Sequence, residues 1–219
     1  MRRLLTLISI AAIASSSVTA AFANDKKSVN APVAIRQAPP APRFADSDRQ
    51  AELAARRSKV LAEMNDESLL ILFSTTPKVY TNDVDFMYRQ ENNLYYLTNL
   101  KQQSATLVLV KSGGSTREML FIPKRNPQFE TWNGKMYSDE DASRISGIQT
   151  IVNAAEFEEF LKELKEKRPF VSKDKSFSFT PTAENLYLLA PETRFDAQDT
   201  REYQREWDLA KTLSNAVPD

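Results

Sequence analysis

The chain has 219 residues, with 29 Lys and Arg against 29 Asp and Glu, so its formal net charge is zero. A balanced charge provides no long-range attraction to nucleic acid or to anionic lipid, which argues against a nucleic-acid-binding function. Cysteine and histidine are both absent, which excludes a disulfide framework, a Ser–His or Cys–His pair and any metal site that needs imidazole.

The first 23 residues are typical of an export signal. Arg2 and Arg3 supply positive charge, residues 4–14 form a short apolar run, and residues 21–23 read Ala-Phe-Ala, an A-x-A cleavage site. A membrane anchor is the alternative, but the apolar run is well short of the roughly 20 residues that span a bilayer. We therefore expect cleavage, export to a periplasm or out of the cell, and no membrane association afterwards.

Residues 24–45 are polar and rich in proline, and they show no apolar periodicity. This composition predicts a flexible, extended leader. Residues 46–219 are then expected to form one domain, because a second domain of ordinary size would not fit.

The domain is predicted to begin with a helix that is capped by Asp46 or Ser47 and runs to about Met64. Its inward face should carry residues at three-to-four spacing, namely Leu53, Arg57, Val60, Leu61 and Met64. Residues 69–73 and 106–110 are apolar on both faces, which is typical of buried central strands. Gly113 and Gly114 predict a hairpin between the second of these strands and residues 118–122.

The second half of the domain is predicted to add helices and two further strands. Ser138 with Asp141 indicates a short helix, residues 149–152 a strand, and Asn153 with Glu156 a cap. The amphipathic helix that follows should face the core with Phe157, Phe160, Leu161 and Leu164. A strand near residues 186–189 and a helix over residues 203–213 complete an α/β fold, a mixed sheet flanked by helices.

Asp83 and Asp85 lie two residues apart in a polar stretch and could form one edge of a magnesium or manganese site. Neighbouring residues do not complete a ligand set. Solvated loop carboxylates are therefore the favoured interpretation.

Two blocks of the sequence have an unusual composition. Residues 88–98 read Tyr-Arg-Gln-Glu-Asn-Asn-Leu-Tyr-Tyr-Leu-Thr and follow Asp83, and residues 121–135 contain Glu-Thr-Trp-Asn-Gly-Lys. Together they resemble the N-terminal domain of the Xaa-Pro aminopeptidase (aminopeptidase P) family. The first block is similar to the family's Asp, Tyr-Arg-Gln segment and aromatic-rich strand, and the second to its acidic, Trp and Gly-basic sequence. Asn99 replaces the usual Gly of the following turn and Met87 a common Pro, so the backbone there is open to question.

The resemblance implies a creatinase-like N-terminal domain with a ribonuclease-H-like mixed sheet. In the family a second, pita-bread-shaped domain supplies two Asp, one His and two Glu to two manganese or other divalent ions, which activate water to cleave Xaa-Pro bonds. This chain has no histidine and stops near the family's linker. We therefore expect no catalytic residue, bound cofactor or metal here, and an inactive chain when alone.

By resemblance, Trp132 and Asp83 match residues that line the substrate cleft, including that of a neighbouring subunit. The expected partners are the catalytic domain or other subunits of a homo-oligomer, and peptides with proline in second place. The alternative interpretation of Trp132 is a partly buried surface aromatic beside a Gly turn.

Three other functions stay open at this point. The chain could be a stand-alone binding or assembly module for proline peptides, or a carboxylate-only metal enzyme that uses Asp83 and Asp85. A creatinase or prolidase relative is also compatible, because those enzymes share the N-terminal fold.

Overall fold

The computed structural model describes residues 39–40, 44–189 and 203–213. The predicted export signal lies wholly outside these residues, and so does most of the predicted leader, so both stay predictions. Within the described ranges, no helix is both long enough and apolar enough to cross a membrane.

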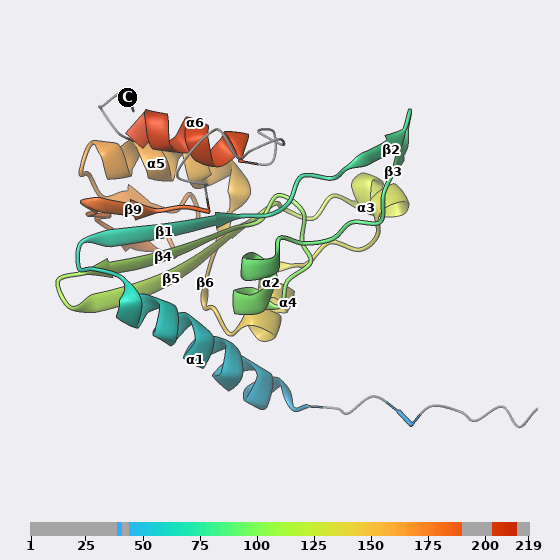
Figure 1. Ribbon diagram of the computed structural model, residues 1–219, viewed down its shortest axis with the longest axis horizontal. Helices are drawn as coiled ribbons and strands as arrows, with labels where there is room; N and C mark the ends of the chain where they lie inside the picture. Colours follow the sequence, from blue (N-terminus) through green and yellow to red (C-terminus); the bar gives the residue numbers. More distant parts are fainter. Residues whose placement is uncertain (1–38, 41–43, 190–202, 214–219) are drawn as a thin grey trace, which may run out of the picture. The chain divides into compact units, whose positions relative to one another are not determined.

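The domain is built on a five-stranded mixed sheet with the order β6-β5-β4-β1-β9 (Figure 1). β1 (Ser68–Phe73) runs antiparallel to β4 (Thr106–Ser112), and β4 forms a hairpin with β5 (Ser115–Ile122). β6 (Thr150–Asn153) lies parallel to β5, and β9 (Asn185–Tyr187) lies parallel to β1. The predicted mixed sheet is confirmed.

The central strands bury both faces because their side chains alternate between two apolar clusters. Leu107 and Leu109 of β4 belong to one cluster, whereas Val108 and Val110 belong to the other. All four are 2% exposed or less. This two-sided burial is the reason that these strands read as continuous apolar runs rather than alternating ones.

Helices cover both faces of the sheet. The first cluster includes residues of α1 (Asp46–Glu63), α2 (Asn92–Thr98) and α4 (Asp139–Ser146). The second includes residues of α5 (Phe157–Lys165), α6 (Gln204–Leu213) and the two-stranded ribbon of β7 (Phe170–Val171) and β8 (Ser178–Phe179). A one-turn 3-10 helix, η1 (Ala154–Glu156), leads into α5. The predicted helix-flanked α/β architecture is therefore confirmed.

Two local predictions were wrong. The N-cap of α1 is Ala45, without a side-chain bond, whereas Asp46 lies in the first turn and pairs with Arg49 and Arg144. The aromatic-rich strand that the resemblance implied is the helix α2.

α2 is helical because its apolar residues follow helical rather than strand spacing. Leu94, Leu97 and Thr98 are buried on one side, and the Glu91 carboxylate accepts a 2.7 Å bond from the Leu94 N–H at the N-terminus. Asn99 ends the helix with φ +57°, in the left-handed region. Asn tolerates this region better than most residues, which explains how it replaces Gly here.

The first cluster surrounds a buried cation. Arg57 of α1 is 1% exposed and donates from Nη1 to the carbonyls of Leu97 at 2.9 Å and Ser146 at 3.0 Å, near the ends of α2 and α4. Its Nε lies 2.9 Å from the Glu118 carboxylate of β5, within ion-pairing distance although the N–H is not aligned for a hydrogen bond. One side chain thus joins three helices and the sheet.

We expect Arg57→Met to lower the free energy of unfolding by about 3 kcal/mol, because it leaves two buried carbonyls and a carboxylate without their cation. Arg56→Met is the matched control. Arg56 is the adjacent, partly exposed residue, which pairs with Glu52, donates to the Tyr96 carbonyl at 3.0 Å and lies 4.3 Å from the Tyr96 ring centre. Its loss should cost about 1 kcal/mol, well below the loss at Arg57. Urea unfolding followed by circular dichroism measures both. Equal losses would contradict the structural role of Arg57.

Candidate functional site

Between β1 and α2 the chain leaves the sheet and forms a separate two-stranded hairpin of β2 (Val79–Thr81) and β3 (Val84–Asp85), which we call the arm (Figure 1). Thr81 pairs with Val84, so Asn82 and Asp83 form the turn, with Asn82 at φ +48°. Asp83 is therefore exposed at the tip of the arm. Asp85 lies in β3 and not in the predicted loop.

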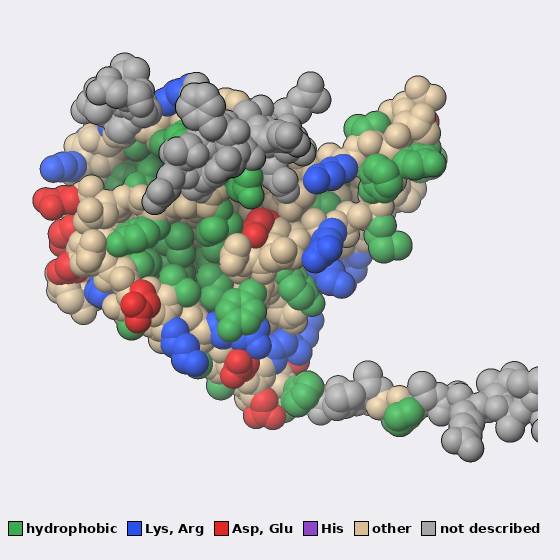
Figure 2. All heavy atoms as spheres, viewed as in Figure 1, with side chains coloured by type: hydrophobic (Ala, Val, Ile, Leu, Met, Phe, Trp, Pro, Cys, Tyr) green, Lys and Arg blue, Asp and Glu red, His purple; other side chains and the backbone are tan. Residues whose placement is uncertain are grey.

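The arm carries several exposed apolar side chains. The Phe86 N–H donates to the Lys78 carbonyl at 2.8 Å, which extends the pairing, and the rings of Tyr80 and Phe86 meet edge-on at 5.0 Å. The exposed apolar residues within the arm are Val79, Tyr80 and Val84, and those directly after it are Phe86 and Met87. Figure 2 shows hydrophobic side chains along this projection. Such a grouping is characteristic of an interaction surface.

Trp132 lies on a short helix, α3 (Pro127–Asn133), that buries none of its residues. Asn126 caps this helix by accepting bonds from the N–H groups of Gln128 and Phe129, at 3.0 and 3.2 Å. The Trp132 side chain is 87% exposed, so the interpretation as a partly buried surface aromatic is wrong. Sequence reasoning placed Trp132 beside a turn, and Gly134, at φ +87°, does end the helix.

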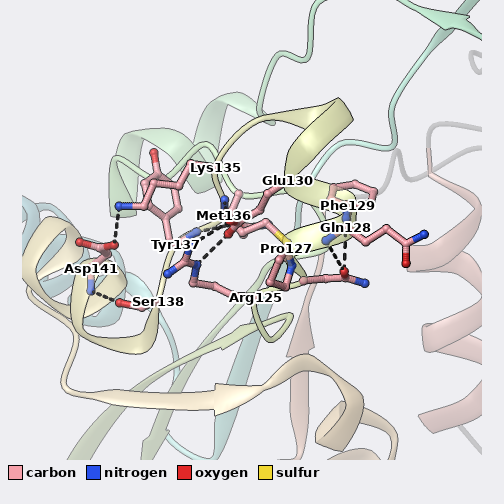
Figure 3. Close-up of polar contacts among 12 residues, drawn as sticks. Arg125, Pro127, Gln128, Phe129, Glu130, Lys135, Met136, Tyr137, Ser138 and Asp141 are labelled. Atoms are coloured by element: carbon pink, nitrogen blue, oxygen red, sulfur yellow. Dashed lines mark hydrogen bonds and ion pairs between the residues drawn. The ribbon is translucent and has the colours of Figure 1, made fainter.

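Polar contacts hold α3 against the segment that leads to α4 (Figure 3). Arg125 donates two bonds to the Glu130 carboxylate, at 2.7 and 2.8 Å, and the Met136 N–H donates to the same carboxylate at 3.1 Å. Ser138 accepts from the Asp141 N–H at 3.1 Å, which confirms the predicted cap of α4. The bond from Arg125, aided by that from Met136, holds the pKa of Glu130 below its ordinary value of 4.5.

The structure places the two predicted site residues on different elements. Within the described residues, no hydrogen bond, ion pair or ring contact joins Asp83 to Trp132. A cleft of about 1130 Å³ opens at the base of the arm, and neither residue lines it. The proximity of Asp83 and Trp132 to a shared substrate therefore stays a prediction.

The cleft brings together residues that sequence reasoning did not assign to a site, although Tyr88 and Arg89 belong to the first motif block. Lys78, Arg89 and Arg205 line it, and the Arg205 guanidinium lies 4.3 Å from the centre of the Phe73 ring. Burial raises the pKa of Tyr88 from its ordinary value of 10 to about 12. Arg205 lies far from the arm in sequence, and no local pattern signals that it reaches this cleft.

The residues present do not fit a manganese site. Among the part of the chain that the structure describes, no group of three or more carboxylate side chains lies close enough together to hold a metal ion. Asp83 and Asp85 are exposed on the arm without a third ligand. No chemistry of this chain is assigned through a metal.

The family described as "Aminopeptidase P, N-terminal domain" matches residues 53–171, a range that includes the arm, α2 and α3. A Haemophilus influenzae Xaa-Pro aminopeptidase is 32% identical over 113 residues, which are 52% of this chain and 26% of that protein. A mouse (Mus musculus) Xaa-Pro aminopeptidase 3 is 28% identical over 128 residues, covering 53% of this chain and 25% of that protein. The chain thus matches about a quarter of each relative's length.

A solved structure agrees with the fold. A Bacillus anthracis protein assigned as an aminopeptidase P superposes with a TM-score of 0.62 and 26% sequence identity. The superposition covers 74% of this chain and 36% of that one. It therefore includes most of the present chain and a minor part of the solved protein.

We expect the substitution Glu130→Gln to destabilise the domain near neutral pH but not at low pH. The pKa of Glu130 is depressed on folding, so its stabilisation is present above the unfolded pKa and is lost as pH falls through the folded pKa. The difference in free energy of unfolding between the two proteins should be constant above about pH 6 and should shrink below about pH 4.5. Urea unfolding over this range measures it, and a difference that does not change with pH would contradict the pairing.

Proposed function

The chain belongs to the aminopeptidase P N-terminal domain family, and on that premise we propose that it gates substrate and supports assembly in an exported Xaa-Pro aminopeptidase. Such an enzyme removes an N-terminal residue that precedes proline. In this proposal the chemistry belongs to a second domain, and the present chain supplies part of the wall of the cleft. The proposal fits a sequence that contains no histidine.

The observation that carries the proposal is the exposure of the family's own motif residues. Trp132, in the second motif block, is 87% exposed, and Met87, which departs from the family pattern beside the arm, is 95% exposed. Burying a Trp side chain stabilises a contact strongly, and its ring packs well against apolar or proline-containing groups. Surfaces of this kind are usually covered in the functional assembly. We propose that the catalytic domain, or a neighbouring subunit of a homo-oligomer, packs against this surface.

Three finer parts of the proposal rest on the relatives and on the sequence. The relatives are described as Xaa-Pro aminopeptidases, which supports a peptide substrate with proline in second place. Manganese use is proposed for the second domain alone. Export rests on the signal-like residues 1–23.

A stand-alone module that binds proline peptides is the second candidate, and the same exposed Trp132 favours it. An accessible aromatic side chain is a common element of proline recognition. The two candidates differ in whether the chain binds such peptides by itself. They also differ in what the gene encodes after codon 219, where the enzyme proposal expects a metal-binding domain and a stop codon without one would contradict it.

We expect the purified chain to release no N-terminal residue from Ala-Pro-Ala in the presence of manganese. Calorimetric titration with the same peptide should give no heat of binding, since one wall of a cleft holds a short peptide poorly. Manganese-dependent release of the N-terminal Ala would contradict the proposal that the chemistry belongs to a second domain. Binding that Trp132→Ala abolishes would favour the stand-alone module.

In the enzyme that includes the catalytic domain, we expect Trp132→Ala to lower kcat/KM for Xaa-Pro peptides by about tenfold or more through a raised KM. Trp132→Phe should retain most of the activity because it keeps an aromatic face. Gln128→Ala, on the same helix, is the matched control. An unchanged KM in Trp132→Ala would exclude Trp132 from the substrate cleft proposed between this chain and the catalytic domain.

A further inference from the structure

We propose that two buried amide side chains, Gln90 and Gln102, position the arm relative to α3 and thereby set the spacing between Asp83 and Trp132. The relevance of this spacing to peptide cleavage rests on the proposed function, whereas the coupling between the arm and α3 can be measured without it. Gln90 and Gln102 are positioning residues in this inference, because neither is assigned a contact with substrate.

Gln90 fixes the base of the arm from both sides. It is 6% exposed, and its Oε1 accepts bonds from the Thr75 N–H at 3.3 Å, the Glu91 N–H at 2.9 Å and the Tyr88 hydroxyl at 2.9 Å. Thr75 precedes the arm and Tyr88 follows it. The opposite end of the same amide, Nε2, donates to the Gln102 carbonyl at 2.8 Å.

Gln102 continues the chain of bonds toward α3. It is 5% exposed, and its Oε1 accepts from the Tyr137 N–H at 3.0 Å while its Nε2 donates to the Gln103 carbonyl at 3.1 Å. The preceding N–H, of Met136, donates to Glu130 of α3. A continuous polar path therefore runs from the arm through Gln90, Gln102 and Tyr137 to α3.

This coupling does not come from burial of the arm or of α3 themselves, although Met136 is buried just after α3 and Tyr137 packs against the first cluster. No residue of α3 is buried, and every residue of β2 and β3 is exposed. Within the described residues, no hydrogen bond, ion pair or ring contact links the arm directly to α3. A buried amide that loses a partner is destabilised because the unpaired group has no water to replace that partner, so each Gln has one strongly preferred orientation. The two amides therefore act as a rigid bracket between the two exposed elements.

The absence of cysteine allows a direct test of this bracket by spin labelling. Cysteines introduced at the exposed positions Thr81 in the arm and Gln128 in α3 would carry nitroxide labels, and pulsed electron paramagnetic resonance would measure their distance distribution. A second label pair, at the exposed positions Ala55 of α1 and Thr116 of β5, reports on the body of the fold.

We expect Gln90→Leu and Gln102→Leu each to broaden the arm–α3 distance distribution by about twofold. The first removes the acceptor of the Thr75 and Glu91 N–H groups at the base of the arm, and the second removes the acceptor of the Tyr137 N–H beyond α3. The second label pair should not change. Gln103→Leu is the matched control, since its side chain lies outside the path. Gln102→Glu keeps an acceptor for the Tyr137 N–H but turns its second oxygen toward the Gln103 carbonyl and buries a charge, so we expect a broadening no larger than that of Gln102→Leu.

A further variant separates positioning from general destabilisation. Phe170 belongs to the second apolar cluster, on the other face of the sheet from α2. Phe170→Leu should therefore lower the melting temperature without broadening the arm–α3 distribution. If Gln90→Leu does not fold, Gln102→Leu and its Glu counterpart still test the same path.

An unchanged arm–α3 distribution in folded Gln102→Leu would overturn the inference, and so would equal broadening in Gln103→Leu. These distances are measured on the chain alone, without substrate or catalytic domain. If the Gln90 and Gln102 variants do not change the arm–α3 distances, the proposed function is unaffected. If the proposed peptidase function is wrong, the effect of the two glutamines on these distances can still be measured.

Discussion

The domain depends on one buried charge, the Arg57 guanidinium. A cation with 1% exposure is tolerated only where polar groups compensate it, and here two carbonyls near the ends of α2 and α4 accept its hydrogen bonds while the Glu118 carboxylate pairs with its charge. Carbonyls at helix ends lack intrahelical partners, so Arg57 satisfies groups that apolar packing would leave unpaired. Arg57 thus fixes α1, α2, α4 and the sheet relative to one another; α2 forms the end of the first motif block, and the second block runs from the end of β5 toward α4.

The molecule combines two kinds of order. The sheet and its helices are held by two apolar clusters, which resist displacement because protein cores are close-packed. The arm and α3 expose their apolar side chains and are held by directional polar contacts, among them the Arg125–Glu130 pair and the amides of Gln90 and Gln102. Such contacts orient an exposed surface without burying it. A surface held in this way remains available to a partner.

Much of the fold followed from local patterns. Residues 69–73 and 106–110 were apolar on both faces, and both are central strands. The stripe of α5 predicted a core-facing helix, and Phe160 and Leu164 are buried. α2 was missed because its tyrosines resemble a strand composition, whereas its burial follows Leu94 and Leu97 at a spacing of three. α3 gave no apolar stripe to find, because none of its residues is buried.

By itself the sequence determined the fold class, the family resemblance and the lack of imidazole chemistry, since these depend on composition and on residues near one another in the chain. It also identified Arg57 as part of the inward face of α1. Only the tertiary structure decided that Arg57 is a buried charge, that Gln90 and Gln102 meet, and that Trp132 is exposed. The Arg57 contacts join residues 40 and 89 positions apart, and single-sequence patterns carry no information about which distant groups converge.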